Sequence, residues 1–376
     1  MIKRLFVFSL VCICILFYIF LFHYNKSDCK IINLKFSTWG SASELKILKP
    51  IISDFERQNP NIHIELIHVP QDYFQKIHLL FASNLEPDVL FINNLNLPIY
   101  KNYLLELSDY IDKTVFYPKS IDALSVDNNL YAIPRDISNL VVFYNKSLFD
   151  KYSISYPNEN WSFDELLLIA EKFKKHNIKA ISYEPSINYA LPYMLYFGGG
   201  ILSDNYVYIA DSANSQKGIN FYKNLAYKYH YAPTLSEIGS KTVAQLFLEQ
   251  KIAMHLSGRW LVPKYRQEAD FVWDVVNFPK YTSPYNASGW AISKKSSHIN
   301  EAVKFVLLLS NKTNISKMAS DGLIMPARED VANSNIFMNG NPKSSFVFIK
   351  SAQKSPVSKV SRNYNKYVNE LNRLFY

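Results

Sequence analysis

From residue 32 onward, apolar residues alternate between strand-like and helix-like spacing. The pattern predicts strands at three short apolar segments, Ile32–Trp39, Ile62–Leu66 and Val89–Ile92. Between the first two, apolar residues recur every three or four positions and predict a helix carrying Leu45, Leu48, Ile52 and Phe55. A second predicted helix covers Asp72–Ser83. This β-α-β-α-β order is typical of a parallel sheet with right-handed crossovers.

The rest of the chain continues the alternation without an internal repeat. Tyr131–Asn145 has a strand-like pattern on both sides of Pro134–Asp136, which is typical of a segment that leaves one domain and enters the next. Later predicted elements are a capped helix from Ser162, a helix at Thr242–Gln250, a strand at Ile252–Leu256 and a helix at Asn300–Ser310. Because 376 residues exceed one ordinary core, the sequence predicts an α/β protein with two domains.

The N-terminus carries a long apolar segment. Lys3 and Arg4 precede an apolar run from Leu5 to Phe22 that only Ser9 interrupts. As a helix the run would reach roughly 27 Å, just enough for a bilayer core. The positive charges before it predict that the following chain is exported. Because no small-x-small cleavage site follows Phe22, we expect an uncleaved membrane anchor, with a cleaved signal peptide as the alternative.

The positions of the cysteines exclude several kinds of modification and site. The cysteines are Cys12, Cys14 and Cys29, and none follows the small residue that a bacterial lipoprotein signal requires. The chain beyond Cys29 has no cysteine. This excludes a disulfide framework and a cysteine-based metal or redox site from the folded part.

The charge distribution and the local motifs predict neither a nucleic-acid partner nor enzyme activity. The formal net charge is +9, but the basic residues are scattered, so we expect no nucleic-acid partner. His63, His68 and His78 lack zinc-motif spacing, and there is no G-x-S-x-G elbow. We therefore expect no metal, no cofactor and no enzyme activity. Since the paired carboxylates of glycoside hydrolases leave no local motif, an exported carbohydrate-active enzyme is the alternative from another class.

Several ordered segments each combine a strand edge with a polar or aromatic turn. They are Phe36–Gly40, Pro87–Phe91, Ala132–Asp136, Ala253–Trp260 and Ser288–Ser293. Open α/β sheets place ligands at strand ends. None of these segments contains an activated nucleophile, so the set predicts a cleft that holds a ligand without reacting with it.

Some of these segments, together with the helices that follow them, carry a family resemblance. The matching stretches are Ala132–Asp136 with Val142–Phe149 and Trp161–Leu166, Phe247–Met254 with Gly258–Trp260, and Gly289–Ser293 with Glu301–Phe305 and Gly322–Arg328. In order and spacing they resemble the extracellular solute-binding proteins of ABC importers. The resemblance is to the sugar-binding family that includes maltose-binding and glycerol-3-phosphate-binding proteins. It covers about residues 32 to 330, and the stretch after Asp330 has no match.

The resemblance implies a fold and a function. The fold would be the type II periplasmic-binding-protein fold, with two α/β domains joined by crossing segments and closed on a ligand by a hinge. After an N-terminal segment at 1–30, domain I would be 31–136 plus 288–325 and domain II 137–287 plus 326–376. The ligand would be a sugar, a polyol or a phosphorylated glycerol derivative, delivered to ABC permease subunits. Glycerol-3-phosphate or a glycerophosphodiester stays open as the ligand. The location would be the periplasmic or extracellular face of the bacterial cytoplasmic membrane.

The chemistry of the side chains selects some ligand-binding candidates. Aromatic faces suit the C–H faces of sugars, which favours Trp39 and Trp260, although each would also suit a core. Arg259 and Arg328 offer guanidinium groups for a phosphate or carboxylate. Glu44 could accept sugar hydroxyls, but its place in a capping box that starts at Ser41 would also explain it.

Position and the resemblance supply the other candidates. Tyr73 and Ser138 match ligand residues of the phosphoglycerol branch, and Trp260 matches a stacking tryptophan of the maltose branch. The others lie beyond a strand end or beside a crossing segment. The full set of expected ligand-binding residues is Trp39, Glu44, Tyr73, Asn93, Asp136, Ser138, Gly258, Arg259, Trp260, Gly289, Trp290 and Arg328.

Overall fold

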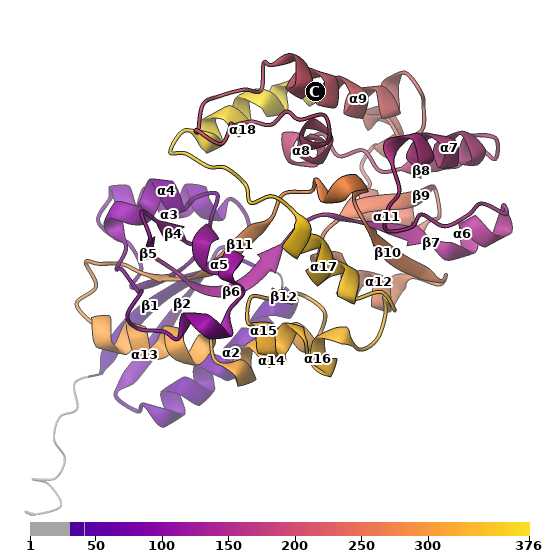
Figure 1. Cartoon of the computed structure of the whole chain (residues 1–376). Coiled ribbons are helices and arrows are strands. Elements are labelled where there is room, and N and C mark those ends of the chain that lie inside the picture. Colours follow the sequence, from indigo (N-terminus) through magenta and orange to yellow (C-terminus); the bar gives the residue numbers. More distant parts are fainter. Residues whose placement is uncertain (1–30, 41) are drawn as a thin grey trace, which may run out of the picture.

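The computed structural model describes residues 31–40 and 42–376. Two α/β units, each built on its own sheet, lie beside each other (Figure 1). The expected anchor at Leu5–Phe22 and the expected capping residue Ser41 lie outside the described residues. Among the residues that are described, no helix has the length and apolar character needed to cross a membrane.

The first sheet is mixed. Its strands follow the order β12 (Met325–Pro326), β6 (Ile133–Ser138), β11 (Asn286–Ile292), β3 (Val89–Asn93), β1 (Ile32–Thr38) and β2 (Ile62–His68). β1 pairs in parallel with β2 and β3, which confirms the predicted β-α-β-α-β unit. β11 is antiparallel to both β3 and β6. The carboxyl ends of β1, β3 and β6 therefore share one edge, at Thr38, Asn93 and Ser138.

Amphipathic helices cover this sheet. α2 (Ala42–Gln58) contacts α13 (Ile299–Leu309), and α5 (Pro118–Ala123) packs on β6 and β11. The apolar stripe of α2 is the predicted one, since Leu48 and Phe55 are fully buried. The smaller elements of this unit are α3 (Tyr73–Ala82), α4 (Leu97–Tyr100), β4 (Ser125–Val126), β5 (Asn129–Leu130), α14 (Lys312–Ser320), α15 (Glu329–Ala332) and α16 (Asn335–Met338).

The second sheet is smaller. Its strands follow the order β10 (Trp273–Asn277), β7 (Val141–Asn145), β9 (Ile252–Ser257) and β8 (Lys179–Ile181). β8 is parallel to β9, so both strands end at the same edge. The helices of this unit are α6 (Lys146–Lys151), α7 (Phe163–Lys174), α8 (Ile187–Tyr196), α9 (Ala213–Tyr227), α10 (Leu235–Ile238), α11 (Val243–Leu248), α12 (Val262–Glu268), α17 (Phe346–Lys354) and α18 (Tyr364–Asn372).

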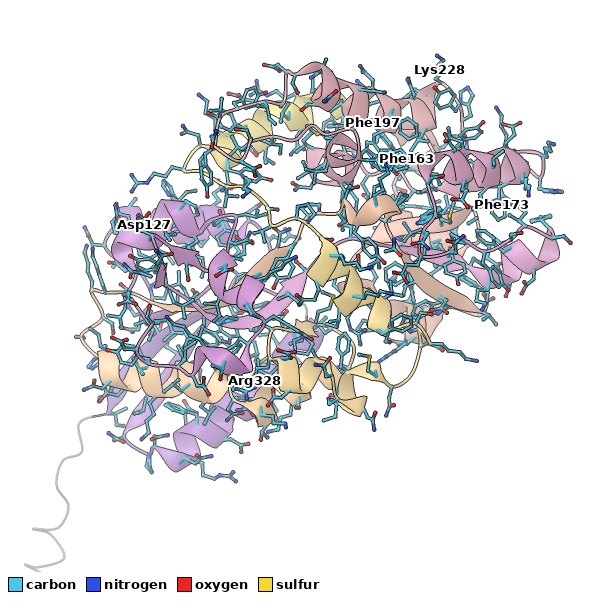
Figure 2. The ribbon with its side chains drawn as sticks, viewed as in Figure 1. Asp127, Phe163, Phe173, Phe197, Lys228 and Arg328 are labelled. Atoms are coloured by element: carbon cyan, nitrogen blue, oxygen red, sulfur yellow. The ribbon has the colours of Figure 1, made fainter. Side chains whose placement is uncertain are left out.

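Local sequence explains the helix starts and the aromatic core of the second unit. α7 begins at the predicted capping box, in which Ser162 and Glu165 satisfy each other's backbone N–H groups. Behind the cap, Phe163 stacks on Phe221 with ring centroids 4.9 Å apart. Figure 2 shows Phe163 and Phe197 close together in this unit. These contacts fix the helices that carry one wall of the site.

The chain passes between the sheets more than once. β6 of the first sheet leads through Asn139 and Leu140 into β7 of the second, and the segment after β10 returns to β11. The C-terminal segment then brings α17 against β10, and a bridge joins Tyr285 to Val357. In Figure 1, α17 lies between the two units. Strand ends of both units therefore meet around these connections.

Candidate functional site

Two neighbouring cavities lie in or beside the second unit, and the smaller one reaches the first unit. The larger, which we call the β9 cavity, has a volume of about 790 Å³, and its polar floor comprises Glu184, Tyr189, His255 and Ser257. The smaller, which we call the hinge cavity, has a volume of about 250 Å³ and is lined from both units, by Ser138 and Asn286 on one side and Asn188 and Leu191 on the other. Tyr189 and Trp260 line both cavities.

Trp260 stands between the cavities because of the turn that follows β9. It lies in a short 3-10 helix over Arg259–Leu261 and is 44% exposed. A Cβ atom on Gly258 would lie 2.0 Å from Cζ3 of the Trp260 ring. Glycine at this position therefore allows the indole ring to fold over the backbone. Both Gly258 and Trp260 are expected site residues, and the structure brings them together.

The floor of the β9 cavity is built from the ends of β8 and β9. The Tyr222 hydroxyl accepts a hydrogen bond from the Glu184 N–H at 2.8 Å and donates to the Glu184 carbonyl at 2.9 Å. Tyr189 on α8 forms a side-chain hydrogen bond with Ser257. Burial lowers the pKa of His255, and Glu184 acts against this shift. Sequence reasoning missed these four floor residues, although the Glu184-Pro185 pair just after a strand was an available signal.

The carboxyl edge of the first sheet carries several of the expected residues. Ser138 lines the hinge cavity. Trp39 follows β1 and is 46% exposed, with its ring 5.9 Å from that of Phe91. Asn93 ends β3, and its Oδ1 accepts hydrogen bonds from the Asn96 backbone and side chain at 3.0 and 2.9 Å. Of these residues only Ser138 lines one of the two cavities.

A buried arginine organises the acidic residues at this edge. Arg135 forms ion pairs with Glu44 and with Asp136, and its guanidinium lies 4.9 Å from the Phe91 ring centroid. Burial alone would lower the pKa of Arg135, but the carboxylates of Asp136 and Glu44 outweigh it and raise the pKa. The expected carboxylates of Glu44 and Asp136 are therefore both held by ion pairs to the same guanidinium. Arg135 is the residue that positions them.

Three expected residues lie in the core of the first unit. The Tyr73 hydroxyl bonds Ser37 Oγ at 2.9 Å and donates to the Phe91 carbonyl at 3.0 Å. Trp290 is fully buried, and a Cβ on Gly289 would lie 2.3 Å from the Ile133 carbonyl oxygen. Buried hydrogen bonds hold Tyr73 and strand packing holds Gly289 and Trp290. None of the three lines either cavity, so their part in binding stays a prediction.

The two expected anion-binding arginines are also engaged elsewhere. Arg259 is 3% exposed, and its Nη2 donates to the Phe337 carbonyl at 3.1 Å. Burial, and then the charge of Arg266, lower the pKa of Arg259 to about 9. Arg328 pairs with Asp330 at 3.0 Å, and Figure 2 shows Arg328 at the lower edge of the first unit, away from α8 and α18. Neither guanidinium lines the two cavities.

The described residues hold no group of three or more His, Cys, Asp or Glu side chains placed to bind a metal ion. The floor instead combines hydroxyl, carboxylate and imidazole groups beside an indole face. Such a mixture of a few polar groups with an aromatic wall is typical of a site for a small polar molecule.

Comparison with known proteins gives a consistent result. A sequence model of the bacterial extracellular solute-binding proteins matches residues 51–342. The multiple sugar-binding protein of Streptococcus mutans is 25% identical over 310 residues, covering 72% of this chain and 69% of that protein. The galactooligosaccharide-binding protein of Bacillus subtilis is 22% identical, covering 80% and 74%.

Solved structures share the fold. An ABC substrate-binding protein of Listeria monocytogenes in complex with cycloalternan superposes with a TM-score of 0.83 at 23% identity, covering 92% of both chains. UgpB of Mycobacterium tuberculosis in complex with glycerophosphocholine gives a TM-score of 0.78 at 18% identity, with the same coverage. The predicted two-domain binding-protein fold is thereby confirmed.

Proposed function

The chain belongs to the family of bacterial extracellular solute-binding proteins, and from this membership we propose that it captures a sugar or sugar derivative and delivers it to an ABC permease. The observation that carries the proposal is the hinge cavity, which is lined from both units and shares the half-exposed indole of Trp260 with the neighbouring β9 cavity. The names of its sugar-binding relatives support the ligand class.

Binding would use residues from both units. Trp39 and Trp260 would offer aromatic faces to sugar rings. Ser138, Asn93 and the carboxylates clamped by Arg135 would offer hydrogen-bonding groups from the first unit. The four floor residues of the β9 cavity would do so from the second. The protein holds and releases its ligand in this proposal, so it is no enzyme.

Hinge closure would bring the two sides together. We assign residues 31–136 plus 288–325 to one moving body and 137–287 plus 326–376 to the other. β12, α15 and α16 lie at their boundary. They pack against α14 of the first body, while Phe337 of α16 accepts the hydrogen bond from Arg259 of the second. Closure over a ligand by two such bodies is a common binding mechanism.

A phosphorylated glycerol derivative remains the second candidate ligand. The similarity to a glycerophosphocholine-bound structure supports it. Against it, Arg259 and Arg328 are both committed to protein contacts. Lys241 and Lys264 line the β9 cavity, but each is paired with a glutamate. The site therefore lacks a ready guanidinium for a phosphate, which favours a neutral sugar.

The family description places the protein outside the cytoplasm, and we propose that Leu5–Phe22 keeps it attached to the membrane. A tethered binding protein would stay at high effective concentration near its permease. Mass spectrometry of protein extracted from membranes tests the anchor. A mature N-terminus between His23 and Lys30 would show a cleaved signal instead.

A thermal-shift screen of the full-length protein in detergent tests the binding function. The panel contains maltotriose, lactose, sorbitol, glycerol-3-phosphate and glycerophosphocholine. A ligand at about 100 times its Kd should stabilise the fold by about 2.7 kcal/mol. If none of these compounds, nor a wider set of oligosaccharides, shifts the transition, the sugar-binding proposal fails. Conversion of an oligosaccharide during incubation would instead show an enzyme.

A further inference from the structure

Strand β9 places an unsatisfied polar atom at the floor of the β9 cavity. His255 is only 1% exposed, and its Nε2 atom has no hydrogen-bond partner among the described residues. The same residue lines the cavity together with Glu184 and Ser257. A buried polar atom without a partner costs free energy, and a bound molecule that supplies the partner removes that cost.

The second ring nitrogen determines which tautomer His255 adopts. Nδ1 lies 2.5 Å from the hydroxyl oxygen of Tyr265 on α12, and burial raises the pKa of this hydroxyl, so it keeps its proton. With the imidazole proton on Nδ1, the Tyr265 proton would have no acceptor among the described residues, and the bare Nε2 would face the Glu184 carboxylate. The hydroxyl therefore donates to Nδ1, which leaves Nε2–H as a free donor.

An acceptor stands beside this donor. Glu184 Oε1 lies 3.7 Å from His255 Nε2, which is beyond the range of a normal hydrogen bond. The backbone of Glu184 is held on both sides by the Tyr222 hydroxyl, so the carboxylate starts from a fixed position. Two hydrogen bonds of about 2.8 Å can span this separation, so one hydroxyl oxygen could bond both atoms.

The other side chains around His255 are mainly aromatic, so Glu184 is the main polar group that faces its Nε2 atom. From β7 and α11 it faces Phe143 and Phe247. The charged residues that line the same cavity are two lysines, already paired with glutamates as described above.

We propose that His255 and Glu184 together hold one hydroxyl group of the bound ligand. The Nε2–H group donates to the hydroxyl oxygen, and the hydroxyl donates its proton to the Glu184 carboxylate. Tyr265 is a positioning residue that fixes the tautomer. This inference rests on the proposed function and deepens it, because it selects a neutral polyhydroxy ligand at the floor. A phosphate or carboxylate there would be repelled by Glu184.

The pair also makes binding depend on pH. Protonated His255 would attract the Glu184 carboxylate directly, and this ion pair would displace the ligand hydroxyl. Because the folded protein binds the proton on His255 less readily than a free histidine does, affinity stays constant at neutral pH. It falls only as the pH drops below about 6.5, the ordinary value for histidine.

Isothermal titration calorimetry with maltotriose, lactose and glycerophosphocholine at pH 7.5 and pH 5.0 tests the proposal. His255→Phe keeps a ring of similar size but removes the donor, and His255→Gln restores a donor. Tyr265→Phe removes the positioning hydroxyl. His78→Phe on the exposed side of α3 is the matched control, since it makes the same change away from both cavities.

The expected result is a loss of about tenfold or more in saccharide affinity for His255→Phe, on the scale of one lost buried hydrogen bond. His255→Gln should recover part of it, and the acid-dependent loss should disappear in His255→Phe. In wild-type protein, the imidazole nitrogen signals should show the Nε2–H tautomer and should shift when the bound saccharide is added. That measurement still decides the matter if a variant does not fold.

Other outcomes separate the two proposals. If wild type binds a saccharide and His255→Phe binds it equally well, the hydroxyl-holding pair is overturned while the binding function stands. An Nδ1–H tautomer that is insensitive to saccharide has the same consequence. Tightest binding of glycerophosphocholine with its phosphate at Glu184 also overturns the pair. If wild type binds no probe, both the function and the pair are overturned.

Discussion

A single residue, Trp260, connects local sequence to the proposed site. The sequence Gly258-Arg259-Trp260 predicts a close turn with an aromatic side chain, and the structure places the ring beside both cavities. Gly258 is required for this position because a side chain there would overlap the ring. The neighbouring Arg259 shows the limit of such reasoning, since its burial depends on Phe337 and Phe348, which are distant in sequence.

The first prediction is that Trp260→Ala weakens saccharide binding by about 1–3 kcal/mol without unfolding the protein, the scale of losing an aromatic contact in an interface. The ring is 44% exposed, so its removal creates no buried cavity. Titration calorimetry and circular dichroism measure both effects. Tyr206→Ala, at an aromatic residue that is 58% exposed and lines neither cavity, is the control and should leave affinity unchanged. Unfolding of Trp260→Ala would instead assign the residue a core role.

At the scale of elements, sequence reasoning succeeded where periodicity is local. The β-α-β-α-β unit, the cap of α7 and the helix-strand pair around β9 all follow from short patterns. Pro134–Asp136 was expected to interrupt a connection, but β6 runs through it, with a register shift opposite, at Ser288 and Gly289. Asp88 precedes β3 and accepts a hydrogen bond from the Lys35 N–H.

The floor residues of the β9 cavity were not predicted from the sequence because they depend on pairing between distant segments. β8 is only three residues long, so its own pattern is weak. Its role appears only when β9 pairs with it and brings Glu184 toward His255. Pairing of distant segments is a tertiary event, and a single sequence carries no direct signal of it. The same holds for Arg135, whose two carboxylate partners come from β6 itself and from α2.

The second prediction concerns the ion pairs that tie β6 to α2. Arg135→Gln should destabilise the fold by about 3–5 kcal/mol, because it leaves the buried Glu44 and Asp136 carboxylates without their counter-charge. Arg259→Met is the contrasting control. Its Nε and Nη1 have no partner among the described residues, so an apolar side chain should cost far less there. Chemical denaturation measures the free energy of unfolding of both variants. Equal losses of stability would contradict the expected difference between the two arginines.

At the scale of the whole molecule, buried tyrosines link stability to pH. Burial raises the pKa of Tyr193, Tyr222, Tyr265 and Tyr285. The folded state therefore keeps these protons above pH 10, while the unfolded state loses them at its ordinary pKa of about 10. Since the unfolded state then binds fewer protons, stability falls as the pH rises above that value.

The third prediction follows from this linkage. Stability should be lost above about pH 10 at a rate of at most about 1.4 kcal/mol per pH unit for each of these tyrosines. Tyrosinate absorbance should rise in two stages, first for solvent-exposed side chains and then together with unfolding. Tyr193→Phe should reduce the alkaline loss relative to Tyr206→Phe. A single early titration of all tyrosines would show that these side chains are accessible to solvent.

The fourth prediction is that a bound saccharide draws the two units together. The hinge cavity is lined from both units, and a ligand that touches both sides favours the conformation in which the sides are closest. Small-angle scattering of the full-length protein in detergent, with the micelle matched or subtracted, should show a smaller radius of gyration on addition of the saccharide found by the thermal-shift screen. Trp260→Ala should need a higher concentration to reach the same compaction, whereas Tyr206→Ala should follow wild type. If the saccharide binds with full affinity and the dimensions stay constant, the site works as a preformed pocket, and the hinge between the two bodies has no part in capture.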